Sequence, residues 1–238
     1  MKEDAINVND TSVPSSGVRR VYPFLIILAI ILIDQLSKIW IKTHMMMGEE
    51  IIITDWFRLH FTENRGMAFG MELPGFWGKM FLSTFRLAAT IGGTWYILHL
   101  IKEKAHWGFI TACSMILGGA IGNMIDGTFY GVIFSDSYGR IAEVFPKEGG
   151  YAGFMQGHVV DMLWFPLFHG FFPDWIPVWG GEYFEFFRPV FNIADSAITT
   201  GVVIILAFQH VFFKEVKKEE VASPTPAADN ATNSSVTD

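Results

Sequence analysis

Cysteine is almost missing from this chain of 238 residues, because Cys113 is the single copy. One cysteine cannot close an internal disulfide, nor can it supply the several thiolates of a cysteine metal site. Cys113 lies in an apolar run, where a free cysteine usually behaves as a small buried side chain. The histidines form neither an HExxH motif nor a close cluster with cysteine, so we expect no metal and no other cofactor.

Charged side chains are also scarce, at 17 % of the chain against 51 % hydrophobic residues. This balance favours a membrane protein over a soluble one. The formal net charge of -7 comes partly from tails and loops and says little about partners. Lysine and arginine do not cluster among aromatic residues, so nucleic acid is not an expected partner.

Two familiar motifs are absent as well. Ser196 lacks the Gly-x-Ser-x-Gly surroundings of a nucleophile elbow. The glycines at 118–122 are not followed by Lys and then Ser or Thr, so they do not form a phosphate-binding loop. A lone histidine such as His158 is more often a hydrogen-bonding or surface residue than a catalytic one. The candidates that remain for chemistry are carboxylates and amides.

Four apolar segments are each close to the roughly 20 residues that a helix needs to cross a bilayer. They run from Val21 to Ile41, Phe76 to Ile101, Trp107 to Ile125 and Ala197 to Phe213. The sequence therefore predicts an all-α membrane protein with four transmembrane helices. The polar stretches 1–18 and 216–238 are expected to be disordered tails around a membrane domain at 19–215.

Two stretches are expected to lie outside the bilayer. Residues 51–54 and 56–61 have the β-branched and aromatic composition of strands, and a turn signal follows at 63–66, which predicts a small sheet at the membrane surface. Residues 129–190 are rich in aromatic side chains, Gly and Pro, and suit interfacial loops or a helix. This long stretch could form either a lid or a larger interfacial platform.

The cationic flanks of the four segments predict the orientation. Arg19-Arg20, Lys102/Lys104 and the lysines at 214–218 all fall on one side, which makes both termini cytoplasmic. The polar residues of the segments and loops then gather at the opposite, outer face. These residues are Asp34, Asn64, Asn123, Asp126, Asp161 and Asp195.

Three charged residues inside the spans each allow two interpretations. Asp34 and Lys38 are four residues apart and face each other on one helix. They could form a purely structural ion pair, or they could orient and electrostatically tune a catalytic site. Arg86 could extend its charge to the nearer interface or hold a ligand headgroup. Gly118, Gly119 and Gly122 would let another helix approach closely.

Asp161 and Asp195 are the candidates for catalysis. Two carboxyl groups brought close share one proton and titrate as a coupled pair. The ionised member can take a proton from water, and the protonated member can bind the scissile carbonyl and later protonate the leaving nitrogen. Such a pair permits amide hydrolysis without a metal ion or a covalent intermediate.

Five blocks of the sequence contain most of these polar residues. In order, the blocks are Asp34-Gln-Leu-Ser-Lys38, Asn64-Arg-Gly66-Met-Ala-Phe69-Gly, Gly118-Gly-Ala-Ile-Gly-Asn123-Met-Ile-Asp126, Val159-Val-Asp161 and Phe191-Asn-Ile-Ala-Asp195-Ser. In this order they resemble the signature blocks of the lipoprotein signal peptidase (signal peptidase II) family, and the resemblance covers roughly residues 21–213.

The resemblance implies an aspartyl endopeptidase of the bacterial inner membrane with its active site on the periplasmic side. Such enzymes cut prolipoproteins just before a cysteine that carries diacylglycerol, and globomycin occupies their site as a non-cleavable mimic. By position, Asp161 and Asp195 would be the catalytic dyad. The remaining assignments are Asn64, Gly66, Asn123 and Asn192 for substrate binding, and Asp34, Lys38 and Asp126 for support. One site in four spans needs no partner chain, so we expect a monomer.

Two features depart from the family pattern. Asp126 is followed by Gly127 where the family commonly has arginine, and Arg140 or Arg188 could substitute. The segments before Asp161 and between Asp161 and Asn192 are longer than the family pattern.

Two other classes of function remain open on the residues alone. Intramembrane acids can relay protons in a proton-coupled transporter, but such acids are expected near the midplane and often in paired repeats. A membrane scaffold without activity would use the acids only as structural hydrogen-bonding groups.

Overall fold

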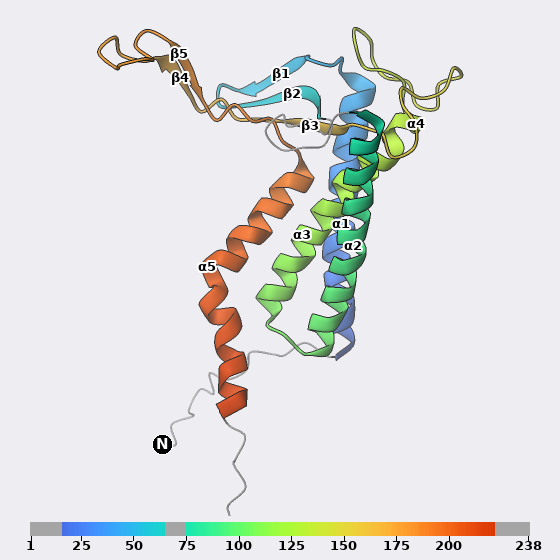
Figure 1. Ribbon diagram of the computed structural model, residues 1–238, viewed down its shortest axis with the longest axis vertical. Coiled ribbons are helices and arrows are strands. Elements are labelled where there is room, and N and C mark those ends of the chain that lie inside the picture. Colours follow the sequence, from blue (N-terminus) through green and yellow to red (C-terminus); the bar gives the residue numbers. More distant parts are fainter. Residues whose placement is uncertain (1–15, 65–74, 222–238) are drawn as a thin grey trace, which may run out of the picture.

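The computed structural model describes residues 16–64 and 75–221. Within these residues four long helices form the body of the molecule (Figure 1). The central helix α3 packs against each of the other three. The four helices are α1 (Ser16–His44), α2 (Gly75–Lys102), α3 (Trp107–Ile125) and α5 (Ile193–Val221).

Three of the four predicted spans are confirmed as helices long and apolar enough to cross a membrane. In the described part of the chain these are Arg20–His44, Trp107–Ile133 and Ile193–Phe213. Helix α2 covers the second predicted segment but is not among the three, and polar residues such as Arg86 and Thr90 interrupt its apolar run. The structure is therefore a mostly helical membrane protein with three candidate spans, and the fourth span stays a prediction.

The third span extends further than the sequence predicts. Helix α3 ends at Ile125 as expected, but the chain continues through the π-helical turn η2 (Asp126–Tyr130) and the short helix α4 (Gly131–Ile133). The stretch 129–190, which was expected to lie outside the bilayer, therefore begins in helical structure.

Small residues set the distance between α3 and its neighbours. A Cβ atom added to Gly119 would lie 2.3 Å from the carbonyl oxygen of Ala194, at the start of α5. A Cβ atom added to Gly118 would lie 3.3 Å from Cα of Ile27 in α1. Because hydrogen replaces the side chain at both positions, two helices approach α3 at backbone distance, which confirms the predicted role of these glycines.

A three-stranded antiparallel sheet crosses one end of the helices (Figure 1), in the order β1 (Glu50–Thr54), β2 (Phe57–Asn64) and β3 (Val159–Trp164). The first two strands confirm the predicted surface sheet. Strand β3 comes from the long aromatic stretch, where the sequence predicted only loops or a helix. A second sheet pairs β4 (Phe168–Phe171) with β5 (Tyr183–Phe186).

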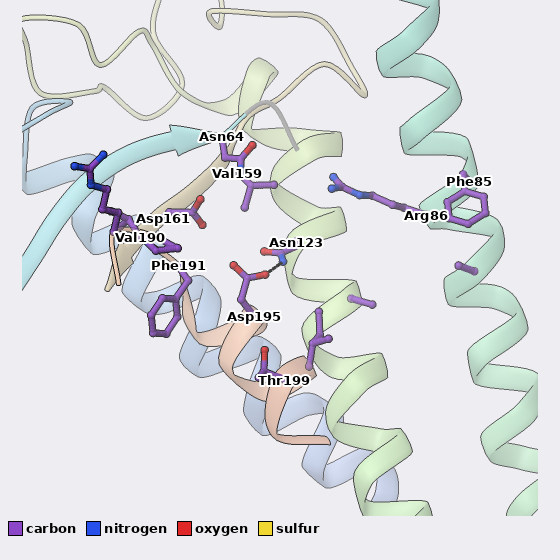
Figure 2. A pocket seen from close by; sticks show the side chains of 15 residues that line it. Asn64, Phe85, Arg86, Asn123, Val159, Asp161, Val190, Phe191, Asp195 and Thr199 are labelled. Carbon is purple, nitrogen blue, oxygen red and sulfur yellow. Dashed lines mark hydrogen bonds between the residues drawn. The ribbon is translucent and has the colours of Figure 1, made fainter. Parts of the chain in front are cut away.

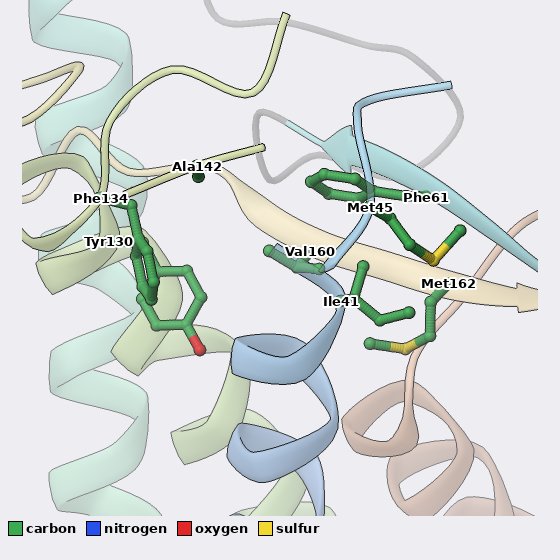
Figure 3. Packing of buried hydrophobic residues seen from close by; sticks show 8 residues of the cluster. All are labelled: Ile41, Met45, Phe61, Tyr130, Phe134, Ala142, Val160 and Met162. Atoms are coloured by element: carbon green, nitrogen blue, oxygen red, sulfur yellow. The ribbon is translucent and has the colours of Figure 1, made fainter. Parts of the chain in front are cut away.

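The sheet is held on the helices by a buried apolar cluster (Figure 3). Val160 and Met162 of β3 pack there beside Phe61 of β2 and Ile41 near the end of α1. Side chains alternate between the two faces of a strand, so burying Val160 and Met162 directs Val159 and Asp161 to the other face. The apolar core therefore orients the acidic side chain.

Candidate active site

The structure brings the two predicted catalytic residues to one cavity. Asp161 lies in β3 and is 3 % exposed, and Asp195 lies in the first turn of α5. Both line a cavity of about 840 Å³ at the sheet end of the helices (Figure 2). Asn64, which pairs with Val159 at the end of β2, and Asn123 of α3 line the same cavity.

Asn192 joins the two aspartates but does not line the cavity. Its fully buried side-chain amide donates a hydrogen bond to Oδ1 of Asp161 at 2.7 Å. The side-chain oxygen Oδ1 of Asn192 accepts one from the backbone N–H of Asp195 at 2.9 Å, three residues on, which is the geometry of a helix N-cap. Asn192 is thus placed to position the pair, and substrate contact remains a prediction for Asn64, Asn123 and Asn192.

Asn123 connects Asp195 to a buried cation. Its amide nitrogen donates to Oδ1 of Asp195 at 2.8 Å. Its oxygen accepts from Nζ of Lys38 at 2.9 Å and from Nδ2 of Asn192 at 3.1 Å. With its oxygen bonded to the ammonium group, Asn123 presents its N–H₂ group to the carboxylate, so the orientation of the amide is determined by its neighbours.

The three predicted supporting residues form one buried cluster. Nζ of Lys38 lies 2.8 Å from Asp34 and 2.7 Å from Asp126, and all three side chains are fully buried. Oδ1 of Asp34 accepts a hydrogen bond from the backbone N–H of Ala194, and Oδ2 of Asp126 accepts one from Val160. The cluster therefore hydrogen-bonds the backbone of Ala194 and Val160, which directly precede Asp195 and Asp161.

Burial raises the pKa of Asp161 to about 7, and the neighbouring Asp195 carboxylate adds to this rise. The hydrogen bond from Asn192 acts in the opposite direction but is the smaller effect. A carboxyl group with this pKa is still partly protonated at neutral pH, which suits Asp161 to hold the proton that the pair shares.

The walls of the cavity are mostly apolar, with Phe85, Ile198 and Phe191 among them. Arg86 of α2 lines the cavity and, as Figure 2 shows, points from α2 towards it. Nη1 of Arg86 lies 3.7 Å from where a Cβ atom of Gly127 would stand. A guanidinium group from α2 therefore lies beside Gly127, the position at which the sequence resemblance led us to expect an arginine.

Of the two arginines proposed as substitutes at Gly127, one reaches the cavity. Arg188 lines it, whereas Arg140 is exposed and donates to the backbone carbonyl of Asp136. Arg86 was expected either to extend to the interface or to hold a headgroup, and its place on the cavity wall favours the second reading.

Sequence reasoning missed a second buried polar cluster beside the sheet. Lys42 of α1 forms an ion pair with Glu63 of β2, and Nδ1 of His158 lies 3.0 Å from the same carboxylate. Burial opposes ionisation of Glu63, but His158, Lys42 and Ser137 together lower the pKa of Glu63 to about 2. His158 thus contacts a structural carboxylate and does not line the cavity.

Gln35 was missed although it stands inside the first block. Its side-chain nitrogen lies 2.8 Å from Oδ1 of Asp126 and 3.1 Å from the carbonyl oxygen of Gly122, so it bonds α1 to α3. A polar residue in an apolar span was the available signal. Ser196 donates back to the carbonyl of Asn192, and Gly66 lies outside the described residues.

The described residues contain no group of three or more His, Cys, Asp or Glu side chains that could hold a metal ion. Their arrangement instead places two carboxyl groups, with hydrogen-bonded amides behind them, in a largely apolar cavity. This arrangement is suited to activating water against a carbonyl group.

Comparison with known proteins agrees with this chemistry. The family described as signal peptidase (SPase) II matches residues 26–212. The lipoprotein signal peptidase of Porphyromonas gingivalis is 48 % identical over 182 residues, which cover 76 % of this chain and 79 % of that protein. The lipoprotein signal peptidase of Amoebophilus asiaticus is 36 % identical over 206 residues, covering 84 % of this chain and 83 % of that protein.

A solved structure shares the fold. It is described as a bacterial membrane enzyme determined by the in meso method at 2.3 Å resolution. It is 21 % identical, with a TM-score of 0.50, and the alignment covers 87 % of this chain and 94 % of that one. The family match over residues 26–212 and the two relatives named above show that the chain belongs to the signal peptidase II family of aspartic peptidases.

Proposed function

We propose that the chain removes the signal peptide from prolipoproteins whose cysteine carries diacylglycerol, cutting on the N-terminal side of that cysteine. The observation that carries the proposal is the meeting of Asp161 and Asp195 on the wall of one mostly apolar cavity. The apolar wall suits a lipid-bearing substrate, and the acid pair supplies the hydrolysis.

The aspartate pair would take one proton from water and give one proton to the leaving nitrogen. The ionised carboxylate removes a proton from water as the water oxygen attacks the scissile carbonyl carbon, and the protonated carboxyl donates a hydrogen bond to the carbonyl oxygen. When the C–N bond breaks, a carboxyl group delivers a proton to the leaving nitrogen. One proton remains on the pair after the cycle, so the dyad is regenerated without a covalent intermediate.

Substrate binding is assigned to the amides and cations of the cavity wall. Asn64 and Asn123 can hydrogen-bond an extended peptide backbone, and Arg86 and Arg188 present guanidinium donors to carbonyl oxygens. A cyclic peptide of the globomycin type would compete for the same wall. One cavity within one chain supports a monomeric enzyme.

We place the enzyme in the bacterial inner membrane with both termini cytoplasmic and the cavity on the periplasmic side, because the cationic flanks lie opposite the sheet. The fourth span would be α2. The cavity lies at one end of the helices, beside the sheet (Figure 2), which favours a peptidase over a transporter with acids at the midplane.

The test is cleavage of a diacylated precursor peptide by the purified chain, beside Asp161→Asn, Asp195→Asn and Asp55→Asn. Asp55 lies in the exposed turn between β1 and β2 and serves as the matched control. Loss of the acid–base pair is expected to lower the rate by roughly 10²–10⁴-fold or more, while the control retains it. Cleavage at the wild-type rate by both folded dyad variants would exclude the proposal.

A further inference from the structure

Strands β4 and β5 form an arm, residues 168–186, that projects sideways from the sheet end of the helices (Figure 1). The two strands pair antiparallel, with Phe168 opposite Phe186. At its tip the backbone bonds to itself, for example from the N–H of Phe172 to the carbonyl of Glu182. The arm is thus a two-stranded ribbon that carries much of its surface away from the body.

The surface of the arm is unusually apolar. Val178 is 85 % exposed and Trp175 is 80 % exposed, both at the tip. Large exposed apolar surface marks a site of interaction with a protein, a ligand or a membrane. The exposed apolar side chains of the arm are Phe168, Phe171, Trp175, Val178, Trp179, Tyr183 and Phe186.

The charged residues of the arm show which kind of attraction to a membrane is open to it. Residues 168–186 contain three acids, Asp174, Glu182 and Glu185, and neither lysine nor arginine. Electrostatic attraction to anionic headgroups, which operates through basic residues, is therefore not available to the arm. Its attraction must come from apolar and aromatic burial.

The base of the arm meets the body where a membrane helix begins. Leu163 and Phe191 exchange backbone hydrogen bonds of 2.7 and 3.1 Å, and the ring of Phe165 stacks on that of Phe191 at 5.6 Å. Helix α5, a candidate membrane span, starts two residues later at Ile193. The arm therefore leaves the body near the sheet-side end of a candidate membrane span, and Trp and other aromatic side chains are favoured at a bilayer boundary.

We infer that the arm lies in the leaflet next to the sheets, with Trp175, Val178 and Trp179 inserted among the lipids at the headgroup boundary. This insertion concerns membrane contact alone and does not depend on which peptide is cut.

The insertion would also set the level of the cavity mouth. The chain returning from β5 supplies four consecutive cavity-lining residues, 188–191, before it reaches Asn192. An arm held in the leaflet thus holds this part of the cavity wall at the depth of the lipids. A membrane-anchored peptide would meet the cavity without leaving the bilayer.

The test labels the tip of the full-length chain with an environment-sensitive fluorophore. Cys113→Ser removes the native thiol, and Val178→Cys then carries a nitrobenzoxadiazole group in nanodiscs of zwitterionic phosphatidylcholine. Tyr138→Cys is the control, because Tyr138 is 67 % exposed but lies in the segment between α4 and β3. Elution volume and helical circular dichroism check that both labelled chains are folded.

At Val178 we expect a blue-shifted emission and about twofold quenching by lipids with a nitroxide near the headgroup, whereas the label at Tyr138 stays water-like. Adding anionic lipid should not increase the shielding, since residues 168–186 contain neither lysine nor arginine. A water-like label at Val178 in these discs would overturn the inference. Shielding of the label only in discs that hold two copies of the chain would indicate self-association and would also overturn it. Shielding found only in native membranes would indicate a protein partner, with the same consequence.

Discussion

The carboxylate of Asp34 accepts a hydrogen bond from the backbone N–H of Ala194 at 2.9 Å, across 160 positions of the sequence. The first N–H groups of a helix have no partner within the helix, and here a side chain of α1 satisfies one of those of α5. The adjacent Asp195 is thereby held at a defined distance from α1. The ion cluster of Lys38 is thus a part of the active-site frame.

Removing the cation of this cluster should destabilise the protein strongly. Lys38→Met leaves Asp34 and Asp126 buried without their shared partner, and breaking a buried pair in this way costs about 3–5 kcal/mol. Thermal unfolding in detergent, followed by the reaction of Cys113 with a thiol-specific dye, measures the loss. Adding Asp126→Asn should recover part of it, because one buried charge is then removed. An unchanged unfolding temperature in Lys38→Met would contradict this account.

A single methyl group between α3 and α5 should disturb both stability and cleavage. The Cβ atom of Gly119→Ala would lie 2.3 Å from the carbonyl oxygen of Ala194, so α5 must shift together with Asp195. Overpacking of this kind costs about 1–3 kcal/mol. Gly92→Ala is the matched control, since a Cβ atom there meets nothing within 4 Å. Equal unfolding temperatures and equal cleavage rates in the two variants would show that the close approach is unimportant.

Cleavage should decline as the pH rises through about 7, because the raised pKa of Asp161 marks the loss of the proton that the pair shares. Below that pH Asp161 can still donate to the scissile carbonyl, and above it the protonated partner is lost. The measurement is the dependence of kcat/KM on pH between 5 and 9, which reports the free enzyme. A rate that stays constant up to pH 9 would mean that Asp161 is not the essential acid.

The Asn192→Ala variant should separate positioning from binding. The amide of Asn192 is buried behind the dyad, so its loss should lower kcat by roughly 10²-fold through misplacement of Asp161 and leave KM nearly unchanged. Its hydrogen bond holds the pKa of Asp161 down, so the alkaline limb should move to higher pH in the variant. A purely structural role would lower the amount of folded enzyme without moving that limb.

Much of the frame could be predicted from local patterns. Apolar runs of bilayer length located the helices, because a membrane helix satisfies its own backbone hydrogen bonds and needs no partner to be recognised. The four-residue spacing of Asp34 and Lys38 predicted the ion pair that the structure contains. The glycines of α3 likewise predicted close helix contacts from a local property, because a residue without a Cβ atom lets another helix approach.

Other parts depended on contacts between distant segments. Strand β3 was not predicted, because its pairing with β2 joins residues about 100 positions apart, such as Thr62 and Asp161. The partnership of Lys42, Glu63 and His158 was missed for the same reason. The place of Asn192 behind the dyad could not be read from its block, since burial depends on what packs over it.

The sequence by itself determined that this is a membrane protein with acids gathered at one end of its helices, because hydropathy, helical period and cationic flanks are properties of neighbouring residues. Only the tertiary structure decided which acids share a cavity, which of them is buried so that its pKa is raised, and which amide orients both. Those properties follow from burial and from hydrogen bonds between α1, α3, β3 and α5, and they exist only once these elements are packed together.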